Sequence, residues 1–222
     1  MNLKIRQKIW CLLFKNKFLR YSLFYKLNRY KGKLKYLDKL KLNKNSVVLD
    51  IGANNGVVSQ YLFDQYSCKI YLFEPNKYCF LILKNIFKKN KKIKIHNFAV
   101  SKSDNLKKLY FNKQINDFRD MAHSEGCSLE VKKSNLSKEK FMYTKCISIK
   151  NLIKKFSFID FIKIDIEGHE YKIIPEILKN FNKIKRVYCE MHGRSHRKEF
   201  KKQFLYYDKK LQKFKNKKFF YW

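Results

Sequence analysis

Glycine and proline are scarce in this chain, whose 222 residues include only six glycines and two prolines. With so few of either residue, no flexible linker between domains is evident. The length suits one medium-sized domain plus an extension, enough to bury about 70% of the surface of the unfolded chain. We therefore expect an extension over residues 1–44 and one domain over residues 45–222.

Paired cysteines and long apolar runs are also lacking. The six cysteines are scattered without C-x-x-C spacing, which argues against a zinc site and favours reduced, buried thiols. The longest apolar stretches fall far short of the roughly 18 residues of a transmembrane helix. The apolar segment 10–14 is followed by Lys15 and Lys17 and by no small-residue cleavage site, so no signal peptide is clear. These absences predict a cytoplasmic protein.

Acidic residues are outnumbered, with 18 Asp and Glu against 52 Lys and Arg, which gives a formal net charge of +34. Such a charge suggests a nucleic acid or an anionic membrane as partner. Nearly all the cations are lysines, however, whereas nucleic-acid readers favour arginine. The chain is also rich in residues with A/T-rich codons, so a biased genome explains much of the excess. We expect no nucleic-acid partner and only weak contact with anionic surfaces.

The segment 5–30 mixes aromatic residues with lysine and arginine. This pattern is typical of a basic amphipathic helix, which could make peripheral contact with the inner face of an anionic membrane. The alternative, which we favour, is an ordinary helix packed on the domain.

The most informative stretch reads VVLDIGANNG and begins at Val47. It predicts a strand ending at Asp50, a tight turn at Gly52 and Gly56, and a helix over 57–66. Glycine allows a backbone turn closed to other residues and a close approach of helix and ligand. Asn54 replaces the middle glycine that a dinucleotide pyrophosphate needs. The turn therefore favours a ligand without a pyrophosphate, such as S-adenosylmethionine (SAM).

A second predicted strand, 70–73, ends at Glu74, about 20 residues after the first glycine, which is the usual spacing of a βαβ unit. An acid there can accept hydrogen bonds from both ribose hydroxyls; the alternative is a solvated strand-end carboxylate. A third strand is expected over 93–100. At its end Asn97 could hydrogen-bond an adenine, or could instead cap a turn, while Phe98 or Val100 could pack on the base.

The remaining pattern alternates strands and helices. Helices are expected over 78–90, 151–156, 171–180 and 196–214, and strands over 107–112, 142–149, 158–166, 185–191 and 217–222. The polar segment 113–140 is interpreted as a loop over the active site that selects the substrate. The fold class is therefore α/β, with a mostly parallel, doubly wound sheet and helices on both faces, preceded by the N-terminal helical extension.

Two further strand ends carry polar residues. The run FIDFIKIDIEGHE contains Asp165 and Glu167, and RVYCEMHG contains Glu190 and His192. Because the carboxyl ends of parallel strands share one edge, these residues should converge with Asp50 and Glu74. Clustered acids repel one another, and a sulfonium, an amino group or a metal ion would relieve that repulsion.

The motifs VVLDIGANNG and FIDFIKIDIEGHE, together with LFEPN, HNFAVS and SIKNL, resemble the FkbM-type SAM-dependent methyltransferase family over residues 46–193. The resemblance implies a Rossmann-like class I fold that transfers a methyl group to a hydroxyl of a sugar, a polysaccharide or a small metabolite. It also implies that Glu74 holds the ribose and that Asp165 faces the methionine or the acceptor. The loop that binds SAM would comprise Asp50, Gly52, Ala53, Asn54 and Gly56. The tail after Gly193 looks short for the closing strand pair of such folds.

A hydroxyl is a poor nucleophile, so a general base is expected, with Asp165, Glu190 and His192 as candidates. His192 has the ordinary pKa closest to neutrality. A divalent metal on these three residues is conceivable but is not predicted. His169 is interpreted as a helix-start residue. The alternatives are an RNA methyltransferase or a non-catalytic, membrane-associated protein with a SAM-binding fold; a NAD enzyme fits least.

Overall fold

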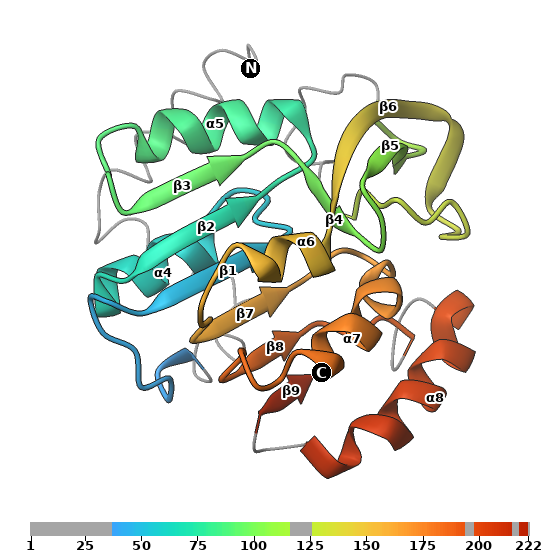
Figure 1. Cartoon of the computed structure of the whole chain (residues 1–222). Helices are drawn as coiled ribbons and strands as arrows, with labels where there is room; N and C mark the ends of the chain where they lie inside the picture. Colours follow the sequence, from blue (N-terminus) through green and yellow to red (C-terminus); the bar gives the residue numbers. More distant parts are fainter. Residues whose placement is uncertain (1–36, 116–125, 194–197, 215–217, 222) are drawn as a thin grey trace.

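The computed structural model describes residues 37–115, 126–193, 198–214 and 218–221. The helix predicted over 5–30 lies outside the described residues. The central feature is a sheet of six strands in which every neighbouring pair is parallel (Figure 1). In spatial order its strands are β3 (Ile93–His96), β2 (Lys69–Phe73), β1 (Val47–Ile51), β7 (Phe161–Ile164), β8 (Val187–Cys189) and β9 (Phe219–Tyr221).

The order of the strands fixes where a ligand can bind. The chain runs outward from β1 through β2 to β3 and then returns to place β7 on the other side of β1. The direction of winding therefore switches between β1 and β7. In open α/β sheets the ligand crevice lies outside the carboxyl ends of the strands at such a switch point.

Helices cover both faces of the sheet, as the alternating pattern predicts. Helices α4 (Val57–Tyr66) and α5 (Lys77–Phe87) contribute Leu62 and Leu83 to one apolar cluster. Helices α6 (Ile149–Lys154), α7 (Glu170–Lys179) and α8 (Lys201–Leu211) contribute to the other. Leu37 and Leu40, from the predicted extension, are buried in the first cluster. Among the described helices, none combines the length and apolar character of a membrane span.

A second, three-stranded sheet lies beside the carboxyl ends of the main strands (Figure 1). Its strands are β4 (Ala99–Ser101), β6 (Leu136–Ser148) and β5 (Asn105–Asn112), in that order. The prediction of one continuous strand over 93–100 is wrong, because the chain leaves the main sheet after His96 and β4 pairs with β6 instead. The strands expected over 107–112 and 142–149 are present as β5 and β6, and β6 begins earlier, at Leu136.

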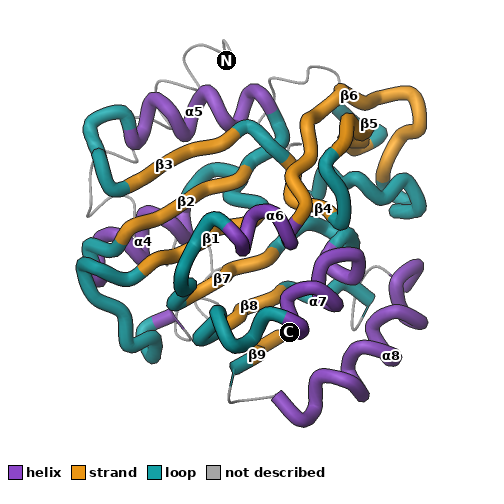
Figure 2. The backbone as a smooth tube through the Cα atoms, viewed as in Figure 1, coloured by secondary structure: helices purple, strands orange, loops and turns teal. Residues whose placement is uncertain are grey.

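The C-terminal elements complete the main sheet. The predicted helix 196–214 is present as α8, between two short 3-10 turns, η2 (Lys198–Phe200) and η3 (Gln212–Phe214). The terminal strand is present as β9, which pairs with β8 in parallel register. Within the described residues, β9 alone therefore forms this edge of the sheet. Figure 2 shows, in teal, the loops that join strands and helices at both ends of the main strands.

Candidate functional site

A pocket of about 230 Å³ lies at the carboxyl ends of β1, β2 and β7. One wall is the β1–α4 loop with Gly52, Ala53 and Asn54, and another is the end of β2. The segment 126–129, within the predicted 113–140 loop, lines it from the side of the second sheet. The pocket therefore occupies the crevice that the switch point predicts.

Each of the two glycines of the β1–α4 loop is needed for a different structural reason. Gly52 has a φ of +81°, and a Cβ there would lie 2.0 Å from the carbonyl oxygen of Asp165. At Gly56 a Cβ would lie 2.6 Å from Cδ2 of Leu83, so this glycine lets α4 pack against α5. Asn54 also has a positive φ, of 46°. Glycine is thus required at Gly52 by the close approach of the β7 chain.

Glu74 is buried in the pocket wall and is fastened to the loop. Its Oε2 accepts a hydrogen bond from the backbone N–H of Asn54, and its Oε1 accepts one from that of Asn76, both at 2.7 Å. Burial raises the pKa of Glu74 to about 7, although these two N–H groups oppose the shift. The carboxyl group can therefore change its charge near neutral pH.

Asn97 braces the same corner. Its side-chain amide donates to the carbonyl oxygens of Glu74 and Pro75, at 2.8 and 3.1 Å. This is the turn-capping alternative, and a hydrogen bond to adenine stays a prediction. Val100 lines the pocket, whereas Phe98 packs against the apolar core.

Asp50 and Lys163 form a buried pair behind the loop. Asp50 accepts a hydrogen bond from the Ser59 hydroxyl at 2.6 Å, and its other oxygen lies 3.3 Å from Nζ of Lys163. Lys163 also donates to the carbonyl oxygen of Gly52 at 2.6 Å and lies 3.8 Å from Asp165. Burial favours the neutral amine, but Asp50 and Asp165 raise the pKa of Lys163 above its ordinary value. Asp50 thus supports the loop from behind through a lysine that the sequence analysis missed.

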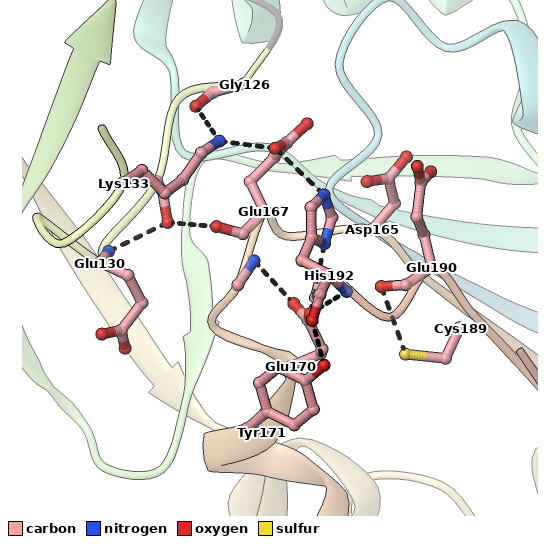
Figure 3. Close-up of polar contacts among 12 residues, drawn as sticks. Gly126, Glu130, Lys133, Asp165, Glu167, Glu170, Tyr171, Cys189, Glu190 and His192 are labelled. Carbon is pink, nitrogen blue, oxygen red and sulfur yellow. Dashed lines mark hydrogen bonds and ion pairs between the residues drawn. The ribbon is translucent and has the colours of Figure 1, made fainter. Parts of the chain in front are cut away.

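Glu167 is the centre of a second ionic network, drawn in Figure 3. Its Oε2 lies 2.6 Å from Nζ of Lys133 and 3.1 Å from Nε2 of His192. On the other side of the ring, Nδ1 of His192 lies 3.2 Å from Oε1 of Glu170. Lys133 also donates to the carbonyl oxygen of Gly126 at 2.7 Å. The network joins the 126–129 wall to the loop before α7 and to the chain after β8.

His192 is held between two carboxylates. Burial alone would lower the pKa of His192, but Glu167 and Glu170 raise it to about 10. The ring is therefore an imidazolium at neutral pH and cannot accept a proton. His192, one of the three predicted bases, therefore lacks the near-neutral pKa of an ordinary histidine.

Asp165 and Glu190 line the pocket beside this imidazolium, as Figure 3 shows. Ligand atoms of Asp165, Glu190 and His192 lie within 4.8 Å of one another. The three predicted catalytic residues therefore come together. A metal ion would need neutral imidazole with a free lone pair, and both ring nitrogens of His192 already face carboxylates. The arrangement fits a hydrogen-bonded ionic network better than a metal centre.

The expected convergence of acids at the sheet edge is confirmed, and part of their repulsion is relieved by cations of the protein itself. Lys163, Lys133 and His192 supply buried positive charge against the carboxylates. These three cations offset part of the negative charge of the cluster. Lys163 could have been found from the sequence, because it interrupts an otherwise apolar strand, whereas nothing in the sequence distinguishes Lys133.

His169 precedes α7, as its interpretation as a helix-start residue predicts. Its Nδ1 lies 2.7 Å from Oε1 of Glu130, and its Nε2 lies 2.9 Å from the Ser101 hydroxyl. The ring lines the pocket. It thus joins the start of α7 to β4 and to the 126–135 segment.

Comparisons with known proteins place this arrangement in a family. Residues 50–218 match the model of the methyltransferase FkbM domain. The chain is similar to the crystal structure of methyltransferase FkbM from Methylobacillus flagellatus KT, with 14% sequence identity and a TM-score of 0.41. That likeness covers 64% of this chain and 31% of the other, so the chain spans about a third of that structure's length. No curated protein matches the chain. Because the family model covers most of its residues, this chain belongs to the FkbM methyltransferase family.

Proposed function

We propose that this protein is a SAM-dependent O-methyltransferase whose acceptor is a hydroxyl of a sugar, a polysaccharide or a small metabolite. Membership of the family supports methyl transfer. The observation that carries the assignment of SAM is the buried Glu74 carboxyl group, which lines the pocket at the end of β2 and is bonded to the backbone N–H of Asn54. A carboxylate at this place can accept hydrogen bonds from a ribose diol.

The residues that line the pocket fit such a cofactor. The backbone of Gly52, Ala53 and Asn54 offers a wall without bulky side chains, and Phe73 and Val100 offer apolar surface for a base. SAM, when bound, supplies a methyl group activated by a sulfonium, with a neutral thioether as leaving group. The protein's main task is then alignment of the acceptor with that methyl group.

Asp165 and Glu190 are the groups we assign to proton removal from the acceptor. Both line the pocket, and a carboxylate can take a hydroxyl proton as oxygen attacks. His192, protonated between Glu167 and Glu170, cannot take that proton at neutral pH. Its role is to hold positive charge beside the two carboxylates.

Calorimetric titration of the full chain with SAM, S-adenosylhomocysteine and NAD tests the cofactor. We expect binding of the first two ligands, no binding of NAD, and weaker binding in Glu74→Gln. Glu139→Gln is the matched control, since Glu139 is exposed on β6. Its affinity should equal that of the wild type.

Folded protein that binds neither SAM compound would overturn the proposal and favour a non-catalytic role. The acceptor is then sought by transfer of a labelled methyl group to candidate sugars and small metabolites. Transfer to RNA instead, with the steep salt dependence of phosphate binding, would contradict the assignment of the acceptor.

A further inference from the structure

The β5–β6 ribbon exposes one face that carries aromatic and lysine side chains. Antiparallel register sets Leu106 opposite Lys145, Lys108 opposite Tyr143, and Tyr110 opposite Phe141. Residues that alternate along a strand share a face. We call these six residues the outer face: Leu106, Lys108, Tyr110, Phe141, Tyr143 and Lys145.

The two sides of the ribbon differ sharply in burial. On the inner side, Leu109 is 2% exposed and Thr144 is 5% exposed. On the outer face, Leu106 is 61% exposed and Tyr143 is 62% exposed. When the inner side of a sheet packs on the protein, its outer side normally exposes polar residues to water. An exposed group of apolar side chains in that position indicates a contact surface.

The charge of the outer face indicates the sign of its partner. Its only charged side chains are Lys108 and Lys145, and none of the six residues is acidic. The chain as a whole has a formal net charge of +34. An anionic partner is therefore attracted both by the face and by the field of the whole protein.

The geometry of the rings discriminates between anionic partners. The Phe141 and Tyr143 rings meet at 82°, and the Tyr110 and Phe141 rings at 60°. Nζ of Lys108 lies 3.9 Å from the Phe141 ring centroid and covers that ring. These rings do not form a flat platform, which stacked bases of single-stranded nucleic acid require. Contact with a lipid interface needs no open ring face. Tyrosine and leucine side chains bury their apolar surface there in the headgroup region.

We propose that the outer face docks on a membrane surface that contains anionic phospholipids. The exposed apolar groups of Leu106 and Tyr143 enter the interfacial region, and Lys108 and Lys145 lie at the lipid phosphates. Leu109, on the inner side of the same strand, lines the pocket. Docking therefore brings the pocket close to the membrane, within reach of an acceptor held there.

Co-sedimentation of the full chain with vesicles tests the proposal. One set of vesicles contains phosphatidylcholine alone, and the other contains equal parts of phosphatidylcholine and phosphatidylglycerol. We expect binding to the anionic set only. The double variant Leu106→Ser, Tyr143→Ser should weaken it about tenfold or more, through lost apolar burial at unchanged charge. The variant Lys108→Gln, Lys145→Gln should weaken it about fivefold per lysine.

The matched control removes two other exposed apolar side chains, Leu81 and Phe158, which are 51% and 44% exposed and lie outside the ribbon. Leu81→Ser, Phe158→Ser should bind like the wild type. Thermal unfolding should show equal midpoints for all variants. For a direct readout, Tyr143→Trp combined with Trp10→Phe and Trp222→Phe should show indole fluorescence that shifts to shorter wavelength with anionic vesicles.

Several outcomes would overturn the proposal. Wild-type binding by Leu106→Ser, Tyr143→Ser, or an equal loss in the Leu81→Ser, Phe158→Ser control, would place the contact elsewhere. Light scattering could also show a dimer that becomes monomeric in Leu106→Ser, Tyr143→Ser. That result would assign the face to a second copy of the chain. Single-stranded RNA binding that the same variant abolishes would assign it to nucleic acid.

Discussion

The ammonium group of Lys133 lies 2.6 Å from the Glu167 carboxylate, and the lysine side chain has no exposed surface. This pair fastens the 126–129 wall of the pocket to the loop before α7, because Lys133 also binds the carbonyl oxygen of Gly126. Removal of one partner leaves the other charge buried without its counter-ion. We expect Lys133→Met to lower the free energy of unfolding by about 3 to 5 kcal/mol, as measured by urea denaturation.

The neighbouring Lys132 provides the control, since it is exposed. Lys132→Met should change the free energy of unfolding by no more than about 0.5 kcal/mol. In a double-mutant cycle, Lys133→Met and Glu167→Gln should cost less together than the sum of their separate costs. Additive costs would show that the two side chains do not stabilise each other.

The ring of His192 makes part of the stability depend on pH. Its folded pKa of about 10 lies above the ordinary value of 6.5. The stabilisation is therefore fully present below pH about 6.5 and is lost as the pH rises through about 10. Glu167 and Glu170 face the ring and cause the shift. We expect His192→Gln to be less stable than the wild type near neutral pH by at least about 1.4 kcal/mol, the equivalent of one pKa unit.

Urea denaturation of wild type and His192→Gln at about pH 6, 8 and 10 measures this difference. It should shrink toward the highest pH, where the wild-type ring has lost its proton. His123→Gln, a substitution outside the described residues, serves as a control for the loss of a histidine. A difference between wild type and His192→Gln that stays constant with pH would contradict an imidazolium at this site.

Much of this site was predictable because its backbone elements follow local sequence patterns. The strand before Gly52, the acid at the end of β2 and the acids after β7 and β8 occupy the edge that a parallel sheet requires. The strand predicted over 93–100 failed because both of its halves favour β structure. Only the tertiary pairing of β4 with β6 shows that the chain changes sheet after His96.

Two of the positive charges at the site, those of Lys133 and His192, could not be predicted in the same way. With 52 Lys and Arg in the chain, a lysine carries little information by itself, and Lys133 becomes buried only through the fold. The pKa of His192 likewise depends on Glu167 and Glu170, which tertiary structure brings to opposite sides of its ring. Such shifts arise from partners far apart in sequence.

The β1–α4 loop should tolerate substitution very differently at Gly52 and Asn54, two positions of positive φ. In Gly52→Ala the new Cβ would lie 2.0 Å from the carbonyl oxygen of Asp165. This oxygen belongs to the backbone, so it cannot easily move aside. We expect a loss of about 3 kcal/mol or more in the free energy of unfolding, from strain and overlap together. Asn54→Gly keeps the backbone N–H that Glu74 accepts and should change stability by less than about 1 kcal/mol. Equal losses in the two variants would disprove a steric role for Gly52.

The pKa of Glu74 predicts how binding of the proposed cofactor responds to pH. In the free protein this pKa is raised by burial to about 7, so about half of the carboxyl groups are protonated at that pH. A ribose diol donates hydrogen bonds, and it therefore binds the ionised form, which is the minor form below pH 7. The apparent dissociation constant for S-adenosylhomocysteine should fall about tenfold between pH 6 and pH 8 and then level off, as the ionised fraction rises from about a tenth to about nine-tenths.

Binding near pH 6 should release a proton, which calorimetry detects as a heat that depends on the ionisation enthalpy of the buffer. Glu74→Gln cannot titrate, so its weaker binding should be independent of pH over this range. If the variant kept the wild-type pH dependence, another group would have to be the one that loses its proton, and Glu74 would not contact the ribose as a carboxylate.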